Sequence, residues 1–162
     1  MPEIGKREIG DRICVVGLGY VGLPTAVAFH GAGFDVTGLD VSEKTISKLK
    51  KGQNPLIDGS SDLEIPVESS KWKVTTDFST AIPNSDVILI TVPTPVNEDN
   101  SPDLSYVKSA SKSVLSNLDR NKNSIIVLES TVYPGVTREI LGGICDDLGI
   151  IQGTQATLAY CP

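Results

Sequence analysis

Short apolar runs alternate with amphipathic segments along this chain. Residues 12–16 (RICVV) and 86–92 (DVILITV) are continuous apolar runs rich in β-branched residues, which is typical of strands buried on both faces. Residues 124–128 (SIIVL) repeat the pattern. Six segments of this kind are predicted to be strands: 12–16, 34–39, 72–75, 86–92, 124–128 and 156–160.

Helices are expected between these strands, because apolar residues recur there at helical spacing and capping residues precede them. Pro24 falls in the first turn of the first helix, and Ser42, Asp77 and Asp103 stand where N-caps of the next three are expected. The five predicted helices are 22–30, 43–51, 78–82, 104–118 and 136–148.

Residues 52–70 are interrupted by Pro55, Gly59 and Pro66, so we expect an irregular segment there with one helical turn. Elsewhere strands and helices alternate strictly. This alternation requires right-handed parallel crossovers and predicts an α/β fold, a doubly wound and mostly parallel sheet of the Rossmann type. We expect one domain over residues 1–162.

Composition excludes several classes of protein. With 40% hydrophobic and 21% charged residues, the chain is typical of a globular domain and not of a disordered one. Twenty acidic residues against 14 basic ones give a formal net charge of −6, which argues against a nucleic-acid partner. A phosphate group bound here is therefore expected to be held by the backbone.

Targeting and redox features point to the cytoplasm. Residues 1–12 mix both charges and have no apolar region, so we expect no signal peptide, and residues 86–92 are too short to span a membrane. Cys14, Cys145 and Cys161 are odd in number and widely spaced, which favours reduced thiols over disulfides. With His30 the only histidine, no metal site is expected.

A glycine-rich turn carries the first chemical signal. Gly17, Gly19 and Gly22 form the pattern G-x-G-x-x-G between the first expected strand and the first helix. In a dinucleotide-binding turn, these glycines permit the tight turn, the approach of the pyrophosphate and close helix packing, respectively. The helix N-terminus then supplies N–H groups and positive potential to the phosphates. A tight turn without a ligand remains the alternative.

Asp40 ends the second expected strand, about 20 residues after the glycine turn. A carboxylate at this position accepts hydrogen bonds from both hydroxyls of an adenosine ribose, which favours NAD over NADP. An acid that merely precedes the Ser42-capped helix is the alternative.

Two hydroxyl-rich loops follow later strands. Residues 91–95 (TVPTP) and 129–135 (ESTVYPG) combine Ser and Thr with prolines that stiffen the backbone. Their position at the carboxyl ends of strands suits hydrogen bonds to a ribose or a nicotinamide amide. Turn formation and helix capping are the alternative for each loop.

Together these motifs resemble the N-terminal domain of the UDP-glucose/GDP-mannose dehydrogenase family, and the last three look most like its UDP-N-acetylhexosamine branch. The segments that carry the resemblance are GLGYVGLP (17–24), Asp40, TVPTPV (91–96), PDL (102–104) and ESTVYPG (129–135). Besides Gly17, Gly19 and Gly22, the residues that the resemblance places against NAD are Tyr20, Val21, Asp40, Thr94, Pro95 and Thr131.

The resemblance implies an enzyme of polysaccharide biosynthesis that oxidises C6 of a UDP-sugar to a carboxylate with two NAD molecules, through a cysteine thioester. It places Thr131 beside the reacting centre and implies a homodimeric parent enzyme. Two departures stand out: Thr45, preceded by Lys44, occupies a position that is often basic, and the sequence ends at Pro162, before the family's Glu and nucleophilic Cys.

We therefore expect an N-terminal fragment that binds NAD but does not oxidise a UDP-sugar by itself. Cys14 and Cys145 are expected to be packing residues. Two alternatives remain: a stand-alone NAD-sensing regulatory domain, and a domain of the β-hydroxyacid dehydrogenase type.

Overall fold

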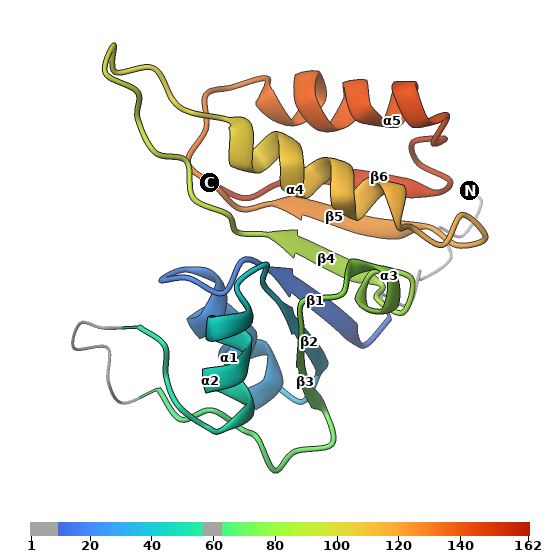
Figure 1. Cartoon of the computed structure of the whole chain (residues 1–162). Helices are drawn as coiled ribbons and strands as arrows, with labels where there is room; N and C mark the ends of the chain where they lie inside the picture. Colours follow the sequence, from blue (N-terminus) through green and yellow to red (C-terminus); the bar gives the residue numbers. More distant parts are fainter. Residues whose placement is uncertain (1–9, 57–62) are drawn as a thin grey trace.

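The computed structural model describes residues 10–56 and 63–162. Its centre is a six-stranded sheet in the order β3-β2-β1-β4-β5-β6, in which every neighbouring pair is parallel (Figure 1). The strands are β1 (Arg12–Val16), β2 (Asp35–Leu39), β3 (Trp72–Thr75), β4 (Val87–Ile90), β5 (Ser124–Leu128) and β6 (Ala156–Tyr160). All six predicted strands are confirmed, with ends that differ by two residues at most.

The helices are α1 (Gly22–Gly31), α2 (Glu43–Lys50), α3 (Phe78–Ala81), α4 (Ser105–Ser116), the π-helical η1 (Thr137–Gly142) and α5 (Gly143–Leu148). Two predicted N-caps are confirmed. The Ser42 hydroxyl accepts the Thr45 N–H at 3.2 Å, and the Asp77 carboxylate accepts the Ser79 N–H at 2.8 Å. Both caps satisfy donors that the first helical turn leaves without a backbone partner.

Helix α4 is shorter than predicted, by one residue at its start and by two at its end. Leu104 occupies the N-cap position, but the Asp103 carboxylate accepts the Ser105 N–H of the first turn at 2.9 Å, as a capping side chain does. At the other end the Asn117 side chain donates to the Ser113 carbonyl at 2.8 Å and the helix stops. Leu118 is buried beyond the helix and not on it.

A second difference concerns the last helix, which was predicted to be regular over 136–148. Its first half, η1, is π-helical, and the change to α5 falls at the adjacent Gly142 and Gly143. Glycine has little preference for the α-helix, which makes a wider turn less costly there. In the described parts of 52–70 the chain forms turns without the expected helical turn, and residues 57–62 lie outside the described residues.

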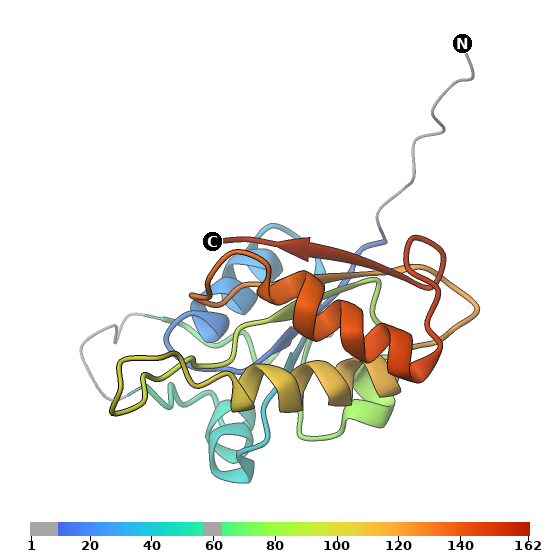
Figure 2. The ribbon, with the colours of Figure 1, turned by 90° about the horizontal axis from the view of Figure 1, so that it is seen from above.

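Two buried clusters hold the layers together. Successive residues of β1 face opposite sides of the sheet, so Val15 belongs to the cluster under α1 and α2, while Val16 belongs to the cluster under α4 and α5. Figure 2 shows α4 and α5 on the same side of β6. Burial of such aliphatic side chains supplies most of the stability of this kind of fold.

The strand order places a crevice between β1 and β4. From β1 the chain proceeds through α1 toward β2 and β3, whereas from β4 it proceeds through α4 toward β5 and β6. Connections that leave in opposite directions open the sheet at its carboxyl edge, which is the ligand-binding position in doubly wound folds. The predicted fold class is confirmed. In the described part of the chain, no helix is long and apolar enough to cross a membrane.

Candidate cofactor-binding site

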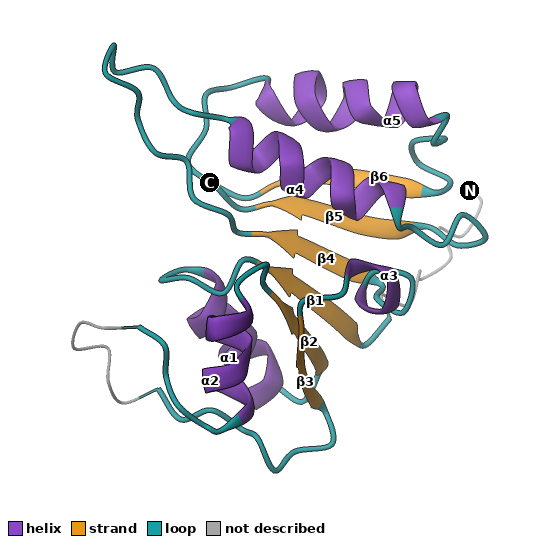
Figure 3. Ribbon diagram, viewed as in Figure 1, coloured by secondary structure: helices purple, strands orange, loops and turns teal. Residues whose placement is uncertain are grey.

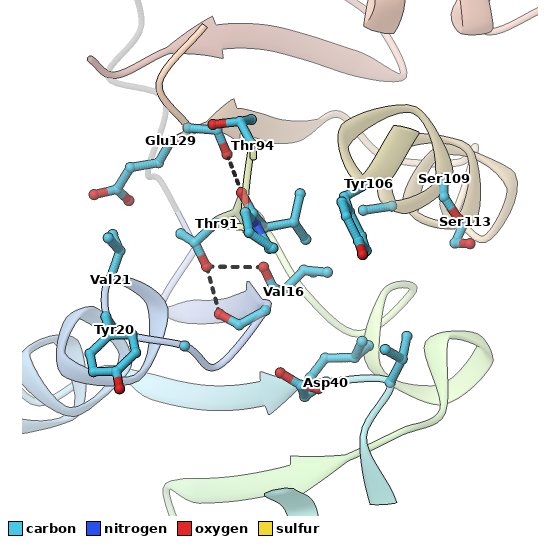
Figure 4. Close-up of a pocket in the computed structure, with 18 of the residues that line it drawn as sticks. Val16, Tyr20, Val21, Asp40, Thr91, Thr94, Tyr106, Ser109, Ser113 and Glu129 are labelled. Carbon is cyan, nitrogen blue, oxygen red and sulfur yellow. Dashed lines mark hydrogen bonds between the residues drawn. The ribbon is translucent and has the colours of Figure 1, made fainter. Parts of the chain in front are cut away.

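A pocket of about 890 Å³ opens at this carboxyl edge. Its walls come from the glycine turn after β1, the end of β2, the loops after β4 and β5, and one face of α4 (Figure 4). The loop after β4 is the long loop that extends away from the sheet in Figure 3. A crevice of this size, with apolar walls and a few convergent polar groups, is typical of cofactor sites.

The glycine turn has the geometry that its three glycines predict. Gly17 has a φ of +94°, in the region that favours glycine, and its N–H donates to the Leu39 carbonyl at 2.8 Å. A Cβ on Gly22 would overlap the Gly17 carbonyl oxygen and the Thr91 hydroxyl, so α1 approaches the strand closely. A Cβ on Gly19 would meet no atom within 4 Å, and Gly19 lines the pocket.

Thr91 links the glycine turn to the loop after β4. Its hydroxyl lies 2.7 Å from the Gly17 carbonyl oxygen and 3.0 Å from that of Val16, and the residue is only 7% exposed. The motif TVPTP includes this threonine, but sequence reasoning did not single it out. A buried Thr directly after an apolar strand was the available signal, because a buried hydroxyl needs a partner.

Helix α1 presents its N-terminus to the pocket. It begins at Gly22 without a side-chain cap and has no acidic residue in its first turn. The adjoining Gly19, Tyr20 and Val21 line the pocket. The positive end of the helix dipole is therefore not neutralised by the protein itself, an arrangement that favours a bound phosphate.

The Asp40 carboxylate lies at the end of β2 and is held by two backbone groups. One oxygen accepts the Leu18 N–H and the other accepts the Ser42 N–H, both at 2.8 Å. Asp40 thus braces the glycine turn against the start of α2. Because each carboxylate oxygen has two lone pairs, it can accept a further hydrogen bond from a ligand in the pocket.

The loops after β4 and β5 are joined by two hydrogen bonds. The Thr94 hydroxyl donates to the Thr131 carbonyl at 3.0 Å, and the Ser130 hydroxyl donates to the Val92 carbonyl at 2.9 Å. The structure therefore brings together Thr94 and Thr131, which are 37 residues apart in the sequence. Pro95 does not line the pocket, and its carbonyl faces Asp103 instead.

Helix α4, the start of α3 and the segment after β2 supply a wall that sequence reasoning missed. The residues of this wall are Val41, Phe78, Tyr106, Ser109, Ala110 and Ser113. Tyr106 and Val41 are 52% and 79% exposed, unusually high values for large apolar side chains. The recurrence of Tyr106, Ser109 and Ser113 at helical spacing was the available signal, but it does not reveal which element the face meets.

Glu129 follows β5 and lines the opposite part of the pocket. Figure 4 shows its side chain extended toward Val21, on the other side of the view from Asp40 and Tyr106. Its backbone N–H donates to the Ile90 carbonyl at 2.9 Å, which fixes the residue at the end of the sheet. Sequence reasoning included Glu129 in a motif without giving it a role.

Cys14, Cys145 and His30 do not line the pocket. Burial raises the pKa of the Cys14 thiol to about 12, and it also raises the pKa of Cys145. Cys161 is exposed, and all three thiols are free. His30 Nε2 lies 2.8 Å from the Ser69 hydroxyl. The described residues contain no cluster of His, Cys, Asp or Glu suited to a metal ion.

Comparison with known proteins identifies the family. Residues 11–162 match the family model of the UDP-glucose/GDP-mannose dehydrogenase family, NAD binding domain. The chain belongs to this family. NAD is therefore the cofactor of the domain, and the glycine turn, the uncapped α1 and Asp40 fit a dinucleotide.

Relatives with 35–36% identity include two UDP-N-acetyl-D-mannosamine dehydrogenases. The protein from Pyrococcus horikoshii is 36% identical over 153 residues, and the one from Escherichia coli strain K12 is 35% identical over 157. Each match covers 93% of this chain but 36% of the relative. The chain thus spans about a third of the length of these relatives.

Solved structures of nucleotide-sugar dehydrogenases share the fold of this chain. A ternary complex of GDP-mannose dehydrogenase from Pseudomonas aeruginosa superposes with a TM-score of 0.85 at 28% identity, covering 92% of this chain and 35% of that one. The UDP-N-acetyl-mannosamine dehydrogenase from Staphylococcus aureus gives 0.80 at 38% identity, covering 93% and 36%. Likeness to a 3-hydroxyisobutyrate dehydrogenase from Mycobacterium tuberculosis, at 17% identity and 0.59, is one of fold alone. Family membership therefore favours a domain of the nucleotide-sugar dehydrogenase type over one of the β-hydroxyacid dehydrogenase type.

Proposed function

We propose that residues 1–162 form the NAD-binding domain of a nucleotide-sugar 6-dehydrogenase that oxidises a UDP-N-acetylhexosamine to its uronate. Relatives at 35–36% identity that are named UDP-N-acetyl-D-mannosamine dehydrogenases support this substrate class. The observation that carries the proposal is the pocket itself, in which the uncapped start of α1 adjoins the open Gly19 and the braced Asp40.

Each part of the pocket suits one part of the cofactor. The glycine turn and the N-terminus of α1 would hold the pyrophosphate through backbone N–H groups. Asp40 would accept hydrogen bonds from the adenosine ribose, with the adenine between the apolar side chains of Val41, Phe78 and Tyr106. The nicotinamide would then lie at the other end, beside Val21, Thr94 and Thr131.

NAD, when bound, supplies the acceptor for the hydride that leaves the sugar carbon. In our proposal the joined loops after β4 and β5 orient the nicotinamide, and Thr131 lies beside the reacting carbon. The Thr94 hydroxyl contributes by fixing the Thr131 backbone at 3.0 Å. Rigid placement of reacting groups is a large part of catalysis, because it replaces a loss of entropy that would otherwise raise the barrier. The nucleophilic cysteine of the family would come from the remainder of the enzyme.

We further propose a cytoplasmic enzyme of polysaccharide biosynthesis that acts as a homodimer. The three free cysteines, of which Cys14 and Cys145 are buried, support a reducing compartment. The dimer and the pathway class rest on the family resemblance. A regulatory NAD sensor is the competing function, and it would need no sugar-binding partner segments.

Selectivity between NAD and NADP tests the assignment of Asp40. Wild-type chain should bind NAD at least about tenfold more tightly than NADP, since the Asp40 carboxylate bonds a 2′-hydroxyl and repels a 2′-phosphate. Asp40→Asn should weaken NAD and reduce the preference. Calorimetric titration with both nucleotides measures the two affinities.

Asp35→Asn is the matched control, because Asp35 is an exposed acid at the opposite end of the same strand. It should leave both affinities unchanged. Thermal midpoints of the two variants separate a loss of binding from a loss of folding, since Asp40 also braces the glycine turn. Equal affinity of the wild-type chain for NAD and NADP would refute the role given to Asp40.

A further inference from the structure

Among the described residues, the Glu129 side chain has no partner, and the pocket that it lines has no cationic side chain. Its side chain makes no hydrogen bond or ion pair with any described residue. Within the described part of the chain, the pocket lining contains Asp40, Glu129 and no Lys, Arg or His. The Glu129 carboxylate is therefore available to a ligand group in the pocket.

The two carboxylates of the pocket differ in their surroundings. Asp40 accepts two backbone N–H groups at 2.8 Å, which already stabilise its negative charge. Glu129 has no such donors among the described residues, and Figure 4 shows its side chain directed toward the apolar Val21. Asp40 is therefore suited to accept hydrogen bonds from neutral hydroxyls, whereas Glu129 is suited to a positive charge.

From this contrast we propose that Glu129 selects the oxidised cofactor by placing its negative charge beside the positively charged nicotinamide ring. The inference rests on the proposed function, which sets the adenosine at Asp40 and the pyrophosphate at α1. With those two parts fixed, the nicotinamide reaches the end of the pocket that Glu129 and Val21 line. The nicotinamide ring carries the only positive charge of NAD.

Reduction removes this attraction. A hydride brings two electrons and one proton to the ring, so the ring becomes neutral and the Glu129 carboxylate again lacks a counter-charge. NADH is then bound less tightly than NAD, and its departure is favoured. A reaction that uses two NAD molecules in succession requires such an exchange at the same site between its two oxidation steps.

The experiment compares the ratio of the dissociation constants, Kd for NADH over Kd for NAD, in wild type and Glu129→Gln. The glutamine keeps the size of the side chain and an acceptor oxygen but removes the charge. We expect the ratio to fall by about three- to tenfold, mainly because NAD binds less tightly. In wild type the ratio should also shrink as salt is raised, since salt screens a half-exposed charge.

Two variants and one ligand serve as controls. Glu139→Gln removes the same charge from an exposed position outside the pocket, where Glu139 meets the Tyr133 hydroxyl at 3.5 Å, and should leave the ratio unchanged. Glu129→Asp keeps the charge and should keep most of the preference. ADP-ribose, which lacks the nicotinamide, should bind wild type and Glu129→Gln equally.

The outcomes separate the two proposals. An unchanged ratio in Glu129→Gln, with NAD still bound, would overturn the role of Glu129 and leave the proposed function intact. If Glu129→Gln weakened the binding of NAD, NADH and ADP-ribose equally, the role of Glu129 would also be overturned, since the effect would then not involve the nicotinamide. Failure of the wild-type chain to bind NAD would overturn the proposed function itself.

Discussion

The charged side chains at the two ends of the parallel strands, the amino edge and the carboxyl edge of the sheet, differ in their partners. At the amino edge, Asp86 accepts two hydrogen bonds from the Arg12 guanidinium, at 2.9 and 2.7 Å, and one from Lys122 at 3.2 Å. At the carboxyl edge, Asp40 is held only by backbone N–H groups and Glu129 has no partner among the described residues. The carboxylate at the amino edge is paired with cations, whereas the two carboxylates at the carboxyl edge have no cationic partner among the described residues.

This difference separates stability from function within one sheet. The Arg12 hydrogen bond, together with Lys122, lowers the pKa of Asp86 to about 2, so the charges at the amino edge contribute to folding. At the carboxyl edge the Glu129 side chain has no partner among the described residues, which leaves its charge available to a ligand. Substitutions at the two edges should therefore have distinct effects.

The largest expected effect is on binding alone. Gly19→Val places a branched side chain in the open space of the pocket, where the pyrophosphate must approach the backbone. NAD affinity should fall by at least about a hundredfold, or about 2.7 kcal/mol, measured by calorimetry. The free energy of unfolding should change little, because a Cβ at this position meets no atom within 4 Å.

Gly31→Val is the matched control, since Gly31 lies at the far end of α1 and a Cβ there also meets no atom within 4 Å. It should leave NAD binding unchanged. If Gly19→Val still bound NAD normally, the glycine pattern would be only a turn.

An intermediate effect is expected at the amino edge, on stability alone. Asp86→Asn should lower the free energy of unfolding by about 1 kcal/mol at pH 7, because Arg12 and Lys122 lose their counter-charge. Half of the Arg12 side chain is exposed, so water screens the pair and limits the effect. Denaturant titration measures the loss, and NAD affinity should stay the same.

The pH dependence of this effect has a definite sign. The pKa of Asp86 is about 2 in the folded chain and lies higher in the unfolded chain, so unfolding takes up a proton at acid pH. Its contribution is complete above about pH 4 and disappears as the pH falls through 2. Asp147→Asn, an exposed acid in the last turn of α5, should cost nothing at any pH. A stability gap between wild type and Asp86→Asn that persisted below pH 2 would contradict the ion-pair explanation.

The smallest expected effect is on NAD affinity and concerns the loops at the carboxyl edge. Thr94→Val removes the hydroxyl that donates to the Thr131 carbonyl at 3.0 Å and keeps the shape of the side chain. NAD affinity should fall about twofold, or about 0.4 kcal/mol, because this exposed bond contributes only to the order of the loops. Thr80→Val, which removes an exposed hydroxyl bonded to the Asp77 carbonyl at 3.3 Å outside the pocket, is the control. Weakening larger than tenfold would indicate direct contact with the cofactor.

Local signals in the sequence were sufficient for the fold and for the glycine end of the pocket. Gly17 permits the positive φ that the turn after β1 requires, and the Ser42 hydroxyl caps α2 by accepting the N–H of Thr45, three residues away. Both features are therefore encoded within a few positions. The prediction of a doubly wound, mostly parallel sheet followed from the alternation of elements and the preference for right-handed crossovers.

The other features of the site could not be predicted, because they depend on contacts between segments that are distant in the sequence. Tyr106, Ser109 and Ser113 line the pocket only because α4 packs where it does, and the Thr94–Thr131 bond joins loops from two strands. Such placements follow from packing of the whole domain and not from any single motif.

The uneven burial of the three cysteines makes the domain a convenient subject for labelling. The Cys14 thiol, with its pKa near 12, remains protonated and unreactive at neutral pH, and Cys145 is also buried. Cys161 is exposed and directly precedes Pro162, which lines the pocket. A maleimide fluorophore added to the unmodified sequence should therefore attach at one position, beside the pocket, and its emission can report occupancy by the cofactor without any engineered residue.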